Sequence, residues 1–254
     1  MKILKIKDLS GPNVWANFPV LEVWVDLEEF EQKPSDLLPG FNERLMNWLP
    51  SMIEHRCSEG VRGGFFERLR RGTWLGHILE HSSLELQTLA GTEVGFGRAR
   101  ETSTSGIYRV AIEYQSEALA RAAVDAAYRL LMAAVNDTAF DVQAEVEKLR
   151  VIAEDTCLGP STKSIVDAAV RRGIPWRRMT SGNLIRLGHG SHQKRILAAE
   201  THTTSAIAES IAQDKELTRR LLNEVGISVP EGGPVDSLET AIEQAKEISG
   251  SIVV

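Results

Sequence analysis

Four side chains suited to metal binding or acid–base chemistry lie close together in the sequence: His77, Glu80, His81 and Glu85. On a helix, at 100° per residue, His77, His81 and Glu85 fall within about 80° of one another, and Glu80 flanks them. Two imidazoles at positions i and i+4 can hold one metal ion such as Zn²⁺, and a nearby carboxylate can act as base on a bound water. The spacing therefore predicts a metal or hydrolytic site with His77 and His81 as ligands and Glu80 as the catalytic group.

A simpler explanation of the same helix stays open. The spacing H-x-x-E-H is that of the inverzincin peptidases, but a pattern of five residues often arises by chance. The polar residues could instead form the solvated face of an amphipathic helix, although Leu84 lies among them and argues against full exposure. The sequence identifies no third ligand. The two cysteines, Cys57 and Cys157, are too few for a disulfide framework and too far apart in sequence for a metal knuckle.

A second candidate is the segment Gly95-Phe-Gly-Arg98-Ala-Arg100-Glu101, which we expect to be a loop. Its two arginines could hold a carboxylate-rich ligand through bidentate pairing. The alternative is an ordinary loop in which surface arginines pair with Glu101.

Two helix starts in the second half of the chain could bind anions. Ser161 and Thr162 follow Gly159-Pro160, and the free N–H groups and dipole of a helix start favour a carboxylate there. Simple N-capping explains the same residues without a ligand. Lys215 follows the capping residue Asp214 and could reach a phosphate, although such a lysine is more often a surface residue.

Hydropathy patterns give the elements that must position these residues. Alternation predicts strands at 2–7, 20–27 and 106–114, and helical spacing predicts helices at 41–52, 73–90, 116–135 and 141–154. Strands interleaved with helices that pack on one face predict an α+β fold, with an α/β sandwich as the N-terminal domain, 1–157.

The second expected domain, 158–254, has a different order of elements. We expect a helix from Ser161 to Gly173, a hairpin over 183–197, capped helices starting at Ser205 and Asp214, an extended segment at 226–230, a helix at 237–249 and a strand at 251–254. A buried strand that stops after four residues predicts that these residues are the front of a longer polypeptide.

Composition excludes several classes of protein. The 254 residues are 43% hydrophobic and 25% charged, which fits a globular chain with a real core. No apolar run reaches the roughly 18–20 residues of a membrane span, and the charged N-terminus is unlike a signal peptide. With two cysteines, a reducing cytoplasm is expected. Lys+Arg 29 against Asp+Glu 35 gives a net charge of −6, which argues against nucleic acid as a partner.

The order of motifs resembles a known family. The run D-K-x-x-T-x-x-L-L-x-x-x-G-I-x-V-P from Asp214 looks like the opening of an ATP-grasp fold. Upstream, L-G-P-S-T (158–162), L-G-H-G-S-H-Q-K-R-I (187–196), R-G-G-F (62–65), G-T-W-x-G-H-I-x-E-H (72–81), G-F-G-R-x-R-E-T (95–102) and G-I-Y-x-V-x-I-E-Y (106–114) resemble the cyanophycin synthetase family. The resemblance covers nearly the whole chain in the expected order.

The resemblance implies a ligase that uses ATP and Mg²⁺ to build a polymer with an aspartate backbone and an arginine on each side-chain carboxylate, through acyl phosphates. This chain would hold the polymer-tethering N-terminal domain and the front of the aspartate-adding ATP-grasp domain, and would not be ligase-competent alone. Aspartate, arginine and a polymer or primer would be its partners, in a cytoplasmic homo-oligomer, a tetramer or dimer.

The resemblance also implies roles for the candidate residues. Lys215 would contact an ATP phosphate, and Ser161 and Thr162 would hold the C-terminal carboxylate of the polymer. Arg98 and Arg100 would bind its aspartate carboxylates. Its arginines would be attracted by three carboxylates: Glu80, Glu85 and Glu101.

Two readings of the N-terminal domain stay open, together with one other ligase class. The domain would tether the polymer, or it would cut polymer into primers as a metal-dependent hydrolase, with Zn²⁺ at His77 and His81. A different ATP-grasp ligase, such as a glutathione-type enzyme, would share the second half of the chain only.

Overall fold

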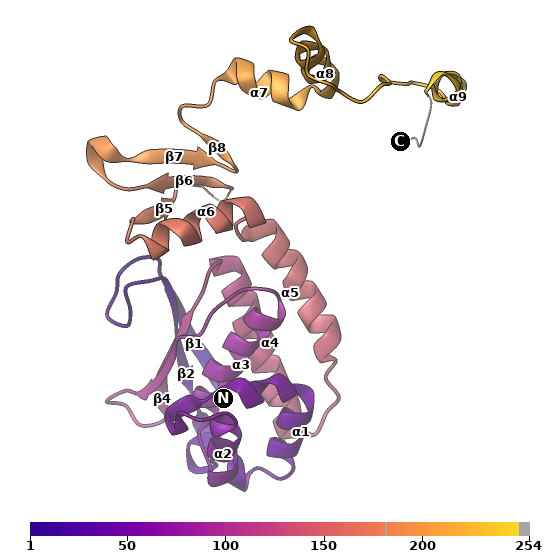
Figure 1. The fold of residues 1–254 in the computed structure, drawn as a ribbon. Coiled ribbons are helices and arrows are strands. Elements are labelled where there is room, and N and C mark those ends of the chain that lie inside the picture. The colour runs from indigo at the N-terminus through magenta and orange to yellow at the C-terminus, as the bar shows by residue number, and fades with distance from the viewer. Residues whose placement is uncertain (181, 249–254) are drawn as a thin grey trace. The chain divides into compact units, whose positions relative to one another are not determined.

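The computed structural model describes residues 1–180 and 182–248. The chain divides into two compact units, Met1–Gly159 and Pro160–Val254. Helices and two antiparallel sheets make up these units, in agreement with the expected α+β class (Figure 1). The strand expected at 251–254 lies outside the described residues.

The first unit is built on a four-stranded antiparallel sheet in the order β1-β2-β4-β3. Its strands are β1 (Lys2–Leu9), β2 (Val20–Asp26), β3 (Gly97–Glu101) and β4 (Ile107–Glu113). The strand β3 corrects the loop expected around Arg98. The alternation of hydrophobic residues is weak there because the inward positions, Gly97 and Ala99, are small.

Five α-helices accompany this sheet: α1 (Phe41–Trp48), α2 (Gly64–Arg71), α3 (Leu75–Leu89), α4 (Glu117–Asn136) and α5 (Val142–Thr156). Two short 3-10 helices, η3 (Pro50–Glu54) and η4 (Cys57–Glu59), precede α2. The glycine-rich segment 60–64 indeed breaks the chain, but it leads into α2, which the sequence patterns did not predict.

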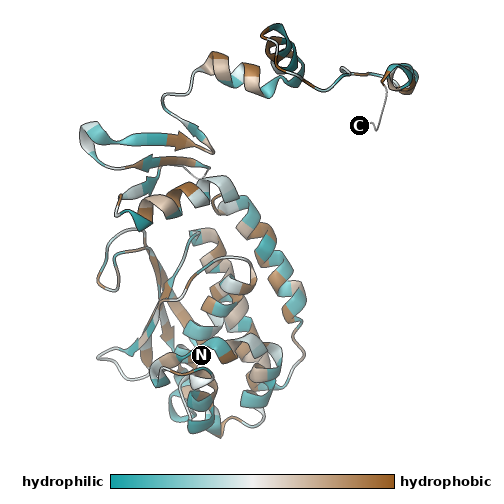
Figure 2. Cartoon of the chain, in the orientation of Figure 1, coloured by the Kyte–Doolittle hydropathy of each residue, from teal (hydrophilic) through white to brown (hydrophobic). Residues whose placement is uncertain are grey.

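The core lies between one face of the sheet and the helices. Strand alternation places Val23, Val25 and Val110 on this face, where all three are fully buried. The helix α3 packs against β3 and β4, and α4 packs against β2 and α3. In Figure 2, brown and teal residues alternate along α5, as expected of a helix with one buried face.

The second unit has its own four-stranded antiparallel sheet, in the order β5-β6-β7-β8. Its elements are α6 (Pro160–Arg171), β5 (Trp176–Arg178), β6 (Leu184–Leu187), β7 (Lys194–Leu197), β8 (Glu200–Thr201), α7 (Ala206–Gln213), α8 (Lys215–Glu224) and α9 (Leu238–Glu247). The predicted caps are present, because the side chains of Ser205 and Asp214 accept from Ala208 N and Leu217 N.

Candidate metal centre

The polar face of α3 is covered by protein and is not a solvated surface. Glu80, His81 and Glu85 are only 6%, 7% and 4% exposed. The ring of Phe65, from α2, stacks on the His81 imidazole with ring centroids 4.1 Å apart. Burial of these polar groups is costly unless each one has a partner or a function. The surface-helix alternative is therefore wrong.

Cys57 joins the two histidines predicted as ligands. One donor atom each from Cys57, His77 and His81 lies within 4.8 Å of the others, and Cys57 Sγ is 3.4 Å from His77 Nε2. Tetrahedral zinc, with bonds of roughly 2.0–2.3 Å, separates neighbouring ligand atoms by about 3.3–3.8 Å. Thiolate and imidazole are the donors that zinc prefers, so the chemistry of this set fits Zn²⁺, and the widest donor separation, up to 4.8 Å, would shorten on binding.

Hydrogen bonds orient both imidazoles. Glu85 Oε2 lies 2.7 Å from His55 Nε2, and His55 Nδ1 lies 2.8 Å from His81 Nδ1. Because a carboxylate only accepts, His55 donates to Glu85 through Nε2. In the tautomer in which His55 accepts through Nδ1, His81 donates through its own Nδ1 and keeps the lone pair of Nε2 for a ligand, the arrangement common in metal sites.

His77 is held in a similar way. Thr73 Oγ1 lies 2.9 Å from His77 Nδ1, which leaves Nε2 toward Cys57. Burial lowers the pKa of His77 to about 4, helped by the charge of Arg68. Burial also lowers the pKa of His81 well below its ordinary value, with further contributions from His77 and His55. Both imidazoles are neutral at physiological pH, as metal coordination requires.

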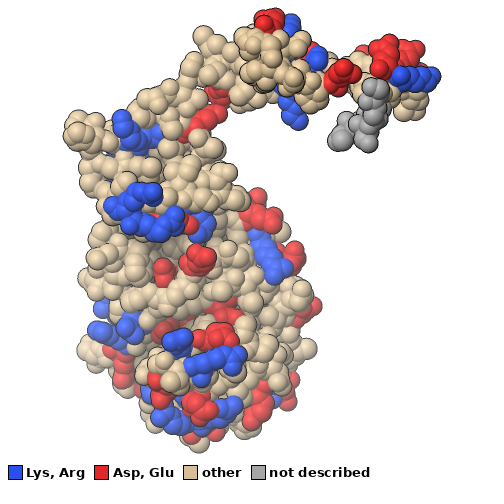
Figure 3. Space-filling model, viewed as in Figure 1, with Lys and Arg blue, Asp and Glu red and all other residues tan. Residues whose placement is uncertain are grey.

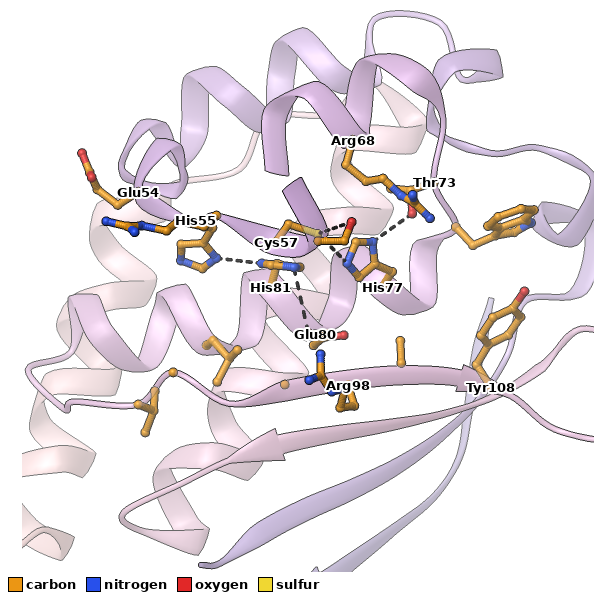
Figure 4. Close-up of a pocket in the computed structure, with 18 residues that line it drawn as sticks. Glu54, His55, Cys57, Arg68, Thr73, His77, Glu80, His81, Arg98 and Tyr108 are labelled. Carbon is orange, nitrogen blue, oxygen red and sulfur yellow. Dashed lines mark hydrogen bonds and ion pairs between the residues drawn. The ribbon is translucent and has the colours of Figure 1, made fainter. Parts of the chain in front are cut away.

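Glu80 is a buried carboxyl group beside this cluster. Its Oε1 is 3.9 Å from His81 Nε2, on the side of α3 that faces β3 (Figure 4). Burial raises the pKa of Glu80 to about 8, although the charge of Arg98 lowers it in part. A carboxyl group with a pKa near neutrality can both take up and release a proton.

A cavity of about 620 Å³ opens beside the cluster. All three candidate metal ligands line this cavity, and so do the charged residues Glu54, Arg68 and Glu80. On the side of β3, the lining consists of Gly95, Gly97, Arg98 and Ala99. The walls carry both signs of charge. The volume lies within the range of small-molecule and peptide sites.

Residues 22–136 match the family described as the cyanophycin synthase-like N-terminal domain. This segment of the chain belongs to that family. Cyanophycin synthetases from Trichormus variabilis and Synechocystis sp. are 45% and 42% identical to the chain over 96% and 100% of its length. The chain spans 28% and 30% of the length of these two relatives. The resemblance expected from the sequence motifs is confirmed.

The remaining predicted site residues fall into two groups, one in each unit. Arg98 and Arg100 are exposed on β3, and no described hydrogen bond or ion pair joins either of them to Glu101. Glu101 instead accepts the Gly106 N–H at 3.4 Å. Glu85 is buried, and its two oxygens are bonded to His55 and Ser51, so the geometry favours a role in positioning His55 over polymer binding.

The carboxylate of Glu85 stays ionised in this environment. Burial alone would raise its pKa, but hydrogen bonds from His55 and Ser51 outweigh that effect and lower it. The charged Glu85 can therefore fix the orientation of His55.

The second unit carries the other candidates. Thr162 is buried in the first turn of α6, and its Oγ1 donates to Ala198 O at 3.4 Å, whereas Ser161 is exposed. Lys215 is the exposed first residue of α8. Among the described residues, no hydrogen bond links Lys215 to Ser161 or Thr162.

Cys57 is the functional candidate that the sequence patterns missed. It lies 20 residues before His77, outside the helix that carries the histidines. Only the fold of η3, η4 and α2 over α3 brings its sulfur to the imidazoles.

Proposed function

We propose that this chain forms part of an ATP-dependent ligase that synthesises cyanophycin, and that the first unit tethers the growing polymer. The observation that supports this most directly is the 45% identity to a cyanophycin synthetase over 96% of the chain. The cavity beside α3 fits the role, because a polymer that carries guanidinium and carboxylate groups needs walls of both charges. Tethering would raise the effective concentration of polymer ends at the catalytic sites.

In the second unit, we propose the start of the ATP-grasp domain that adds aspartate. ATP and Mg²⁺ would supply phosphorylation of the polymer carboxylate, which turns a poor electrophile into an acyl phosphate. Lys215 is free of described partners and would meet a phosphate. Ser161 and Thr162, in the first turn of α6, would hold the C-terminal carboxylate. The whole protein would act as a homo-oligomer in the cytoplasm, with aspartate and arginine as its other substrates.

The complete protein provides the test of the ligase proposal. With aspartate, arginine and a short primer, it should release ADP and phosphate, and omission of either amino acid should stop sustained turnover. Absence of ATP consumption under these conditions would overturn the proposal.

Tethering can be measured on the chain itself by cosedimentation with insoluble polymer. Replacement of both Arg98 and Arg100 by Ala should lower the amount of protein that cosediments with the polymer about tenfold, because two charge-assisted contacts are lost. Arg121→Ala, on α4 and paired with Glu117, is the matched control and should sediment like the unaltered chain. Equal retention of the double variant would exclude these arginines from polymer binding.

Hydrolysis of polymer into primers is a second candidate function. One observation favours it, because the sulfur of Cys57 lies close to the imidazoles of His77 and His81. Zn²⁺ held by Cys57, His77 and His81 would supply Lewis-acid activation of water. Glu80 would take up and release the proton at its carboxylate, while Glu85 and His55 hold His81 in the required tautomer.

Mass spectrometry of polymer incubated with the zinc-loaded chain tests this function. Release of short fragments should stop in Glu80→Gln, which keeps all three ligands, and polymer retention should persist. His81→Ala should lose both zinc and cleavage. Fragment release that is unchanged in Glu80→Gln would rule out hydrolysis at this site.

A further inference from the structure

The strand β3 has one unpaired edge. It is the last strand in the sheet order and pairs only with β4. The N–H of Glu113 donates to Phe96 O, and the N–H of Thr102 donates to Ile107 O. In an antiparallel pair, hydrogen-bonded and non-hydrogen-bonded positions alternate. Even-numbered residues of β3 therefore bond to β4, and the N–H and C=O groups of Gly97, Ala99 and Glu101 point away from it.

This unpaired edge faces the cavity beside α3. Gly95, Gly97 and Ala99 line the cavity together with the Cys57 cluster. Figure 4 shows β3 between β4 and the histidines, with the side away from β4 turned toward the cluster. An extended chain laid along this edge would run past the metal centre.

The side chains of β3 divide between two faces of the sheet. Gly97 and Ala99 point toward α3, whereas Arg98 and Arg100 leave the strand on the opposite face. On that face, a second cavity of about 620 Å³ is lined by Arg98, Arg100 and Arg109 with Trp15, Trp24 and Phe96. The long side chain of Arg98 also reaches the cavity beside α3, so it borders both cavities. In Figure 3, basic side chains gather on the flank of the first unit where Figure 1 places its sheet.

A buried carboxylate organises this second cavity. Glu22, 2% exposed, accepts the indole N–H groups of Trp15 and Trp24, each at 2.8 Å, and also accepts from Arg109. Two guanidinium groups lie near the Trp15 ring, with Arg109 at 4.9 Å and Arg100 at 5.8 Å from its centroid. The aromatic wall is therefore fixed before any ligand arrives. The guanidinium groups of Arg98 and Arg100 have no described ion-pair partner.

The spacing of the two free arginines matches an extended peptide. Residues two apart in a strand repeat at about 6.6–6.8 Å. A chain with the same side chain on every residue presents identical groups at that repeat, so two alternate units can meet Arg98 and Arg100 at once. In arginylated polyaspartate, the arginine amino group is consumed in the side-chain amide, and each unit keeps the α-carboxylate of its arginine free.

We propose that the cyanophycin backbone adds to the open edge of β3 as an extra strand, in the manner of β-strand addition. Its main chain bonds to Ala99 and its neighbours, and alternate units place their arginine carboxylates on Arg98 and Arg100. The other units project toward the Cys57 cluster. This inference rests on the proposed tethering function and names its binding mode.

The test removes one outward N–H group without breaking the sheet. Ala99→Pro lacks the N–H that points away from β4, a placement that edge strands tolerate. Ala99→Ser keeps the N–H and is the matched control. Calorimetric titration of each full chain with a short synthetic oligomer of arginyl-aspartate units should give about tenfold weaker binding for Ala99→Pro, and unchanged binding for Ala99→Ser.

A second measurement uses the unaltered chain and is independent of the folding of the proline variant. Hydrogen exchange of the Ala99 and Glu101 amides should slow when the oligomer binds, whereas the Arg98 and Arg100 amides, already bonded to β4, should change little. Oligomer binding by the unaltered chain without slower exchange at Ala99 and Glu101, or equal affinity of a folded Ala99→Pro, would overturn the edge-strand mode alone. No binding by the unaltered chain would overturn tethering as well.

Discussion

At the scale of single residues, burial changes the acid–base behaviour of the side chains in the H-x-x-E-H pattern of α3. The same imidazoles on an exposed helix would titrate near their ordinary pKa, whereas burial keeps His77 and His81 neutral. The sequence was sufficient to place both histidines and Glu80 on one helix, as the structure has them, and their roles stay predictions. It could not predict Cys57, because no local spacing connects that residue to α3.

Substitution of the thiolate tests the donor set. We expect Cys57→Ser to lower zinc affinity at least about tenfold, because a hydroxyl is a much poorer zinc ligand than a thiolate. Competition with a chromophoric chelator measures the affinity. Cys157→Ser, at the end of α5, is the matched control and should bind zinc normally. Unchanged zinc affinity in Cys57→Ser would remove this residue from the site.

At the scale of secondary structure, the close approach of α3 and β3 depends on a missing side chain. A Cβ atom at Gly97 would lie 2.5 Å from Cγ and Oε1 of Glu80. The same small residue explains why sequence patterns did not predict β3. A strand whose inward positions are Gly97 and Ala99 shows little hydrophobic alternation. The longer elements, such as α4 and β2, were predicted well because their buried faces are strongly hydrophobic.

We expect Gly97→Ala to destabilise the first unit by about 1–3 kcal/mol, because the new methyl group overpacks the buried Glu80. Urea denaturation followed by circular dichroism measures the change in free energy of unfolding. Gly95→Ala, at a position with no atom within 4 Å of the added Cβ, should change stability by less than about 0.5 kcal/mol. Equal stability of the two variants would show that α3 and β3 can separate freely.

The pairing of α4 with α5 gives a pH-dependent prediction. Hydrogen bonds from Arg129 and Lys148 lower the pKa of Glu145 from 4.5 to about 2. Because the folded-state pKa is the lower one, the stabilisation is complete above about pH 4.5 and is lost as the pH falls toward 2.

Glu145→Gln should therefore lower the free energy of unfolding by about 1 kcal/mol at pH 7 and by almost nothing at pH 2. The expected value is modest because Arg129 and Lys148 are largely solvated. Thermal unfolding at both pH values measures the difference. Glu147→Gln, whose carboxylate is 65% exposed in its pair with Arg150, should cost less than about 0.5 kcal/mol at either pH. A loss of stability in Glu145→Gln that is independent of pH would exclude the ion pairs as its cause.

At the scale of the whole molecule, the two units differ in how they are stabilised. A continuous hydrophobic core extends through the first unit, from Met1 to Ala153. In the second unit, the described helices α7, α8 and α9 contain no buried residue. None of the described helices is both long enough and apolar enough to cross a membrane. Sequence patterns found the helices of the second unit from their caps, Ser205, Asp214 and Ser237, which are local signals.

Because the continuous hydrophobic core, from Met1 to Ala153, lies within the first unit, a fragment of residues 1–159 should fold alone. We expect it to unfold in one cooperative transition and to keep the zinc affinity of the full chain. Calorimetry and the same chelator competition test both points. A fragment without a cooperative transition would show that the first unit depends on residues beyond 159.

The indole of Trp15, held by Glu22 near two guanidinium groups, has an optical consequence. Positive charge beside an indole shifts the energy of its excited state, so neutralisation of Arg100 by an arriving anion would change the colour and intensity of the emitted light. The chain thus carries an intrinsic fluorophore at the outer face of its sheet, and occupancy there could be followed in real time without a chemical label.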